Sequence, residues 1–133
     1  MIEQQFEVLK DECLRKHNAE ASCTTLTNGG KLISISNFKV GPGWSQQQIT
    51  VHFVAPPGYP AARPDCFWVE PTGLRLAGGG TPLNTNDSNP IPGDTQVGRR
   101  TTWFSWHLQN WNPNQDTLLT FLEVIKQRLS PAR

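Results

Sequence analysis

Apolar residues recur at helical intervals near both ends of the chain. The first set consists of Ile2, Phe6, Leu9 and Cys13. This spacing, with charged residues between the apolar ones, predicts an amphipathic helix over residues 2–17. The second set consists of Leu118, Leu122, Ile125 and Leu129. It predicts a C-terminal helix that begins at the capping pattern formed by Asn112, Pro113 and Gln115.

Between these helices, polar and apolar residues alternate in short runs, as they do in half-buried β-strands. Four such runs lie at residues 22–26, 31–38, 47–55 and 66–70. Asn28, Gly29 and Gly30 separate the first two runs and are typical of a tight hairpin turn. Residues 71–102 show no periodicity and contain three consecutive glycines, so we expect a long irregular loop there. The predicted fold is α+β: an N-terminal helix, a four-stranded antiparallel meander, a long loop and a C-terminal helix.

The composition excludes several classes of protein. A length of 133 residues suits one domain, 1–133, with a proper core. The net charge of +1 gives no electrostatic reason to expect nucleic acid or an anionic membrane, and no apolar run approaches the roughly 20 residues that span a bilayer. Three widely spaced cysteines form neither a disulfide framework nor a zinc motif, and the N-terminus lacks the apolar core of a signal peptide. We therefore expect a cytoplasmic protein without a metal or a cofactor.

Several motifs occur in an order that resembles the ubiquitin-conjugating (UBC) or RWD-like fold. Tyr59-Pro60 and Pro64 precede the fourth predicted strand, and Trp111 and Pro113 lie at the start of the C-terminal helix. Three further segments resemble a bacterial branch associated with multi-ubiquitin operons, UBC-like family E. These segments are PDCFWVEP at residues 64–71, GGTP at 79–82 and WFSWH at 103–107.

The resemblance implies a UBC-like component of a bacterial ubiquitin-like conjugation pathway, with a ubiquitin-like protein and its activating enzyme as protein partners. Members of the superfamily carry the modifier as a thioester on a cysteine that precedes the tryptophan of the W-x-P motif. The corresponding position, eight residues before Trp111, is Trp103, and no cysteine follows Cys66. We therefore expect a protein that lacks the usual nucleophile and binds the modifier or its activating enzyme. Whether the protein is an enzyme is left open.

Two other functions stay open from the residues themselves. An active conjugating enzyme with a non-standard site would use Cys66, or Ser105 with His107 as its base, because the latter two share one side of an extended strand. By motif, Asp65 and Asp116 are the carboxylates available to orient the imidazole. Without such chemistry, the thiol is a small buried residue and the Ser/His pair holds the long loop against the helix start. The second alternative is a plain RWD-like interaction domain.

The residues that we expect to contact protein partners are aromatic or basic: Trp103, Trp106, Arg99, Arg100 and Trp44. Trp44 lies in a Gly/Pro turn and is the tryptophan that we expect to be exposed. The other two tryptophans could instead fill the core. The two arginines close the long loop, where solvent or an acidic partner surface would meet their charges.

Overall fold

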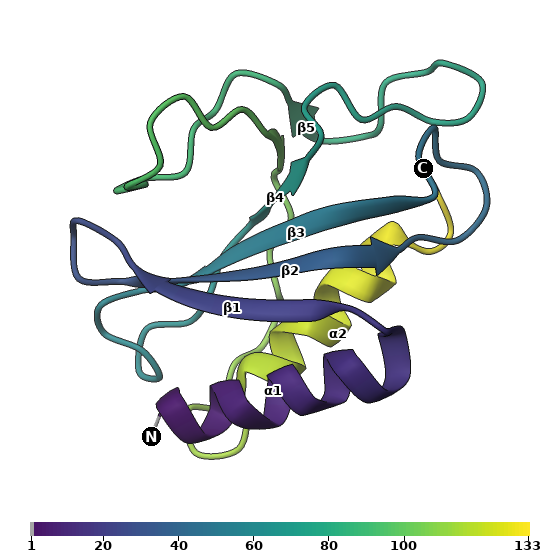
Figure 1. Ribbon diagram of the computed structural model, residues 1–133. Helices are drawn as coiled ribbons and strands as arrows, with labels where there is room; N and C mark the ends of the chain where they lie inside the picture. The colour runs from purple at the N-terminus through teal and green to yellow at the C-terminus, as the bar shows by residue number, and fades with distance from the viewer. Residues whose placement is uncertain (1) are drawn as a thin grey trace.

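A six-stranded antiparallel sheet forms the centre of the protein, and both helices cover one of its faces (Figure 1). The computed structural model describes residues 2–133. The helices are α1 (Ile2–His17) and α2 (Leu118–Leu129), and the strands are β1 (Glu20–Thr25), β2 (Lys31–Lys39), β3 (Gln48–Ala55), β4 (Phe67–Glu70), β5 (Thr85–Asn86) and β6 (Thr102–Phe104). Across the sheet the order is β1-β2-β3-β4-β6-β5. The predicted α+β class is confirmed, and β5 and β6 add two strands to the four expected.

The main core lies between the sheet and the two helices. The apolar stripe predicted for α2 is confirmed, because Leu118, Leu122, Ile125 and Leu129 are all buried. α1 contributes Leu9 and Cys13, which are fully buried. β3 faces the helices with Val51 and with Phe53, whose ring lies 5.2 Å from that of Phe121. Burial of each large apolar side chain contributes about 1.5–3 kcal/mol, so these stripes determine how the helices pack on the sheet.

A smaller apolar cluster lies on the opposite face of the sheet. Its members are Leu26, Leu32, Val54, Trp68, Ile91 and Trp103. Side chains alternate along a strand, so Trp68 and Trp103 point away from the helices while Phe67 and Phe104 point into the main core. Ile91 comes from the segment between β5 and β6, which therefore covers part of this second face.

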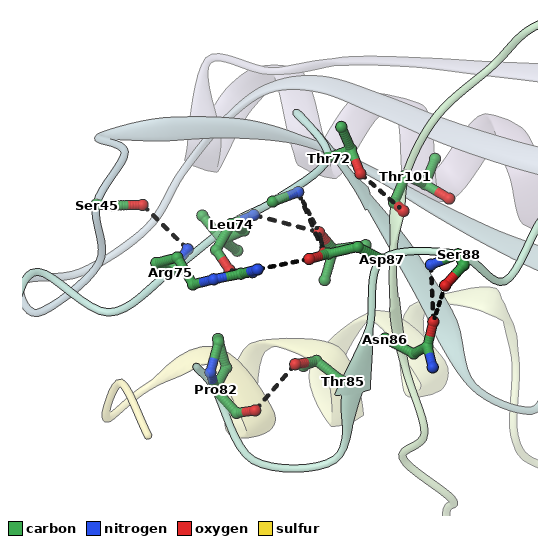
Figure 2. A network of polar contacts seen from close by, with 12 residues as sticks. Ser45, Thr72, Leu74, Arg75, Pro82, Thr85, Asn86, Asp87, Ser88 and Thr101 are labelled. Atoms are coloured by element: carbon green, nitrogen blue, oxygen red, sulfur yellow. Dashed lines mark hydrogen bonds and ion pairs between the residues drawn. The ribbon is translucent and has the colours of Figure 1, made fainter. Parts of the chain in front are cut away.

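The carboxylate of Asp87 holds three parts of the long loop together (Figure 2). It accepts hydrogen bonds from the backbone N–H of Gly73 at 3.2 Å and from Oγ1 of Thr102 at 2.7 Å. It also forms an ion pair of 2.6 Å with Arg75, whose backbone N–H donates to Ser45. The hydrogen bond from Arg75 lowers the pKa of Asp87 below its usual value. The segment predicted to be irregular is thus ordered by polar side chains, and it contains β5.

The start of α2 differs from the predicted one. Thr117 is the N-cap residue: its Oγ1 accepts from the N–H of Leu119 at 3.2 Å, and Oγ1 of Thr120 accepts from the N–H of Thr117 at 2.9 Å. Asn112, the predicted cap, instead forms a turn in which its side chain accepts from the N–H of Asn114. Asparagine followed by proline suits a turn as well as a helix start, and here a turn precedes the helix.

Trp44 is buried, which corrects the prediction that it is exposed. Its side chain is 6% exposed, and its Nε1 donates to the carbonyl oxygen of Leu129 at 2.8 Å. Its backbone forms an isolated β-bridge with Leu76, and its ring packs edge-on against Phe104 at 6.2 Å. The Gly/Pro turn therefore folds over the core, and Trp44 is not available to a partner.

Candidate functional site

The N-terminal end of β4 and the C-terminal end of β6 lie side by side and carry the polar residues of the candidate site. Phe67 pairs with Phe104 in the antiparallel register, so Cys66, just before β4, lies beside Ser105, just after β6. The backbone N–H of Cys66 donates to the carbonyl oxygen of Trp106 at 3.1 Å, which holds the two strand ends together. The three catalytic candidates from the sequence, with Asp65, therefore meet at one place.

The imidazole of His107 lies at the centre of this group. Its Nδ1 is 2.6 Å from Oδ1 of Asp65, and its Nε2 is 3.5 Å from Oγ of Ser105. A proton on Nδ1 suits the contact with the carboxylate, and it leaves the lone pair of Nε2 facing the hydroxyl. Carboxylate, imidazole and hydroxyl in this order are the parts of an activated hydroxyl nucleophile.

The group opens to solvent at a shallow pocket. The pocket has a volume of about 200 Å³ and is lined by Asn84, Ser105, Trp106, His107 and Gln109. The side chains of His107 and Asp65 are 57% and 55% exposed, so the imidazole is accessible. Asn84 enters the site because the N–H of Ser105 donates to its carbonyl oxygen at 2.9 Å. Sequence reasoning did not include Asn84 or Gln109, since only the pairing of β5 with β6 brings Asn84 beside the serine.

Cys66 forms the buried floor of the group. Cys66 is 7% exposed, and its Sγ is 3.9 Å from Nδ1 of His107. Burial raises the pKa of the Cys66 thiol and the charge of Asp65 adds to this, while hydrogen bonds from the Trp103 side chain and the Trp106 backbone act in the opposite direction. Its φ of 62° lies in the left-handed region, which costs a non-glycine residue about 1–3 kcal/mol and is common at functional sites. The thiol is therefore close to the imidazole but poorly activated.

The residues expected to contact partners have different environments. Trp103 is partly exposed within the small apolar cluster, and Trp106 lies against the guanidinium groups of Arg128 and Arg133 at 5.4 and 5.3 Å. The side chain of Arg99 is only 12% exposed. It forms ion pairs with Asp94 at 2.7 Å and with Glu70 at 3.5 Å, which corrects the prediction of a solvated charge. Arg100 is exposed as predicted.

The motif residues Tyr59, Pro60, Pro64, Trp111 and Pro113 belong to the two segments that flank the site. Nε1 of Trp111 donates to the carbonyl oxygen of Pro60 at 2.7 Å, and its ring lies 5.9 Å from that of Tyr59. The Tyr59–Pro60 peptide bond is cis. The hydroxyl of Tyr59 donates to the side chain of Gln5 on α1. These contacts fix the segment that leads from His107 to α2.

Comparison with known proteins identifies a family. The family model described as prokaryotic E2 family E matches residues 10–132, which confirms the resemblance found in the motifs. No curated protein and no solved structure matches the chain. Within residues 2–133, neither helix is both long enough and apolar enough to cross a membrane.

Proposed function

The chain belongs to prokaryotic E2 family E, an E2-like component of a prokaryotic ubiquitin-like conjugation system, and we propose that it carries the modifier as an ester on Ser105. The observation that carries this proposal is the continuous contact from Asp65 through His107 to Ser105 at the rim of a pocket. The hydroxyl of Ser105 is thus a candidate acyl acceptor, two residues after Trp103, where the motif comparison expected a cysteine.

The proposed step is an acyl transfer between two proteins. The modifier arrives as a thioester on its activating enzyme, and Oγ of Ser105 attacks the carbonyl carbon while Nε2 of His107 accepts the hydroxyl proton. The carbon–sulfur bond then breaks, and the departing thiolate receives the proton from the imidazolium. Asp65 keeps the imidazole oriented and stabilises its positive charge. The contact of 3.5 Å is long for a hydrogen bond, as is common before a substrate tightens a site.

Accessibility supports Ser105 over Cys66 as the nucleophile. Ser105 is partly exposed and lines the pocket, whereas the cysteine is 7% exposed. A thiol reacts as the thiolate, and the raised pKa of Cys66 keeps it protonated near neutral pH. A serine beside an imidazole does not have to be ionised beforehand, because the imidazole accepts the hydroxyl proton during the attack.

A conjugation assay with ATP, the cognate activating enzyme and its ubiquitin-like protein tests the proposal. We expect an adduct that survives thiol reductants and is cleaved by mild alkali. The variants Ser105→Ala and His107→Gln should lose it, while Cys66→Ser and the control Cys23→Ser should keep it. An adduct that thiol reductants release, and that Cys66→Ser abolishes, would overturn the role of the serine. Melting temperatures of all variants separate lost chemistry from lost folding.

Trp103 favours a second function, a binding component without a covalent step. By its spacing of eight residues before Trp111, this tryptophan corresponds to the position that the resemblance assigns to the cysteine. It packs with Trp68. The second function predicts a reversible complex with the modifier or its activating enzyme and no adduct under any condition. Equal affinity of the wild-type and Ser105→Ala chains, together with the absence of adduct, would favour it. Binding of neither partner would favour the plain interaction domain.

A further inference from the structure

Asp65, Cys66 and His107 also have the chemistry of a metal site. One ligand atom from each residue lies within 4.8 Å of the ligand atoms of the other two. Thiolate, imidazole nitrogen and carboxylate oxygen are the ligand types that zinc prefers, usually with three protein ligands where a coordination position stays open. We infer that these three side chains bind one Zn²⁺ ion, at a site separate from the hydroxyl of Ser105.

The distances are close to those of tetrahedral coordination. With zinc–ligand bonds of about 2.0–2.3 Å, neighbouring ligand atoms lie roughly 3.3–3.6 Å apart. The sulfur of Cys66 is 3.9 Å from Nδ1 of His107, which is within a few tenths of an ångström of this range. Nδ1 is 2.6 Å from Oδ1 of Asp65, so this pair has to separate by less than about 1 Å. Both of these side chains are more than half exposed, and rotation opens the gap without disturbing the core.

The sulfur of Cys66 has a fixed place in the group. The backbone N–H of Cys66 donates to the carbonyl oxygen of Trp106 at 3.1 Å, so the sulfur is a fixed ligand while the other two adapt. Asp65 is ion-paired with no lysine or arginine of residues 2–133, so its charge remains available to the cation.

Zinc and the proposed ester chemistry would exclude each other, a consequence that rests on the proposed function. The metal takes the lone pair of Nδ1, so the proton of the neutral imidazole moves to Nε2. Nε2 then faces Ser105 as a donor and no longer accepts the hydroxyl proton. Zinc would therefore inhibit the acyl transfer without touching the serine.

Cobalt substitution tests the site without reference to activity. The untagged full chain, reduced and metal-free, is titrated with Co²⁺, and we expect one equivalent to produce a near-ultraviolet thiolate-to-cobalt absorption band that Zn²⁺ removes. Cys66→Ser should abolish the band, and the surface variants Asp65→Asn and His107→Gln should weaken cobalt binding at least roughly tenfold. Ser105→Ala and Cys23→Ser should bind as the wild type does. No band in the wild type, or a band that survives Cys66→Ser, would overturn the inference.

The conjugation assay then separates the two proposals. With zinc present, we expect the wild type to lose its adduct and Cys66→Ser to keep it. Stoichiometric cobalt binding with no adduct in the absence of metal would leave the metal site standing and refute the ester. If the wild type is shown to hold zinc and still forms its adduct, coordination of the metal by His107 is refuted.

Discussion

Replacing Arg128 with methionine is expected to change the free energy of unfolding by less than about 1 kcal/mol, although it removes a buried charge. The residue is 1% exposed, and no Asp or Glu side chain within residues 2–133 is ion-paired with it. Burial lowers the pKa of its guanidinium from 12.5 to about 10. The side chain stays charged at neutral pH. At about 1.4 kcal/mol per pKa unit, keeping this charge in the folded protein lowers the free energy of unfolding by roughly 3 kcal/mol.

Contacts of similar total size offset this cost. Nη2 of Arg128 donates to the carbonyl oxygen of Leu83 at 2.7 Å and to a backbone oxygen of Arg133 at 3.0 Å, each contributing about 1 kcal/mol or more. The guanidinium lies over the rings of Phe104 and Trp106 at 5.0 and 5.4 Å, each contributing about 0.5–2 kcal/mol. Methionine keeps the ring contacts of the side-chain stem and loses the charge together with its hydrogen bonds. Alanine loses the stem as well, so Arg128→Ala is expected to cost about 2–4 kcal/mol.

Urea unfolding followed by tryptophan fluorescence gives the free energy of unfolding of the wild type, Arg128→Met and Arg128→Ala. A control, Lys126→Met, removes a partly exposed cation from the same helix and should stay within about 0.5 kcal/mol of the wild type. A methionine variant as unstable as the alanine variant would refute the reasoning, because the charge itself would then be stabilising. If both variants were as stable as the wild type, the stem of Arg128 would not stabilise the fold through its ring contacts.

Three further predictions concern the loop, the helix start and the thiols. Asp87→Asn is expected to lower the free energy of unfolding at pH 7 by at most about 1 kcal/mol. Because the folded-state pKa of Asp87 is lowered, this difference should disappear as the pH falls below its ordinary value of 3.8 and through the lowered pKa, measured by urea unfolding at each pH. Thr117→Ala should cost about 1 kcal/mol and Asn112→Ala clearly less, by the same measurement; equal costs would contradict the observed cap. Mass spectrometry after thiol labelling should find exposed Cys23 modified well before Cys66, and the reverse order would contradict the burial of the latter.

The helices and the long strands were predictable because their signals are local. The apolar spacing of α2 and the alternation in β3 reflect which side of one element faces the core, and neighbouring residues suffice to show it. Local signals misled where distant segments decide the outcome. The turn around Trp44 is typical of an exposed loop, but its bridge to Leu76 folds it over the core. Arg99 closes a polar loop, but Glu70 on β4 and Asp94 pair with it.

The candidate site was predictable only in part, because it depends on the pairing of β4 with β6. The motifs pointed to Ser105 and His107, but they left Asp65 and Asp116 as equivalent carboxylates. β6 spans only Thr102–Phe104, too few residues to show an alternation, so neither the strand nor its register could be read from the sequence. The register brings Asp65 to the imidazole across 42 positions of the chain, whereas Asp116 accepts a hydrogen bond from the N–H of Asn112.

Residues 105–107 form a short bridge between two side chains, Phe104 and Leu108, that are both buried in the main core. One inserted glycine would leave the two anchors in place but would shift the backbone between them, where the N–H of Ser105 donates to Asn84 and the carbonyl oxygen of Trp106 accepts from Cys66. The same insertion would let the imidazole drift from the carboxylate that it now meets at 2.6 Å. The spacing between these two anchors, as much as the identity of the residues between them, therefore sets the geometry of the site.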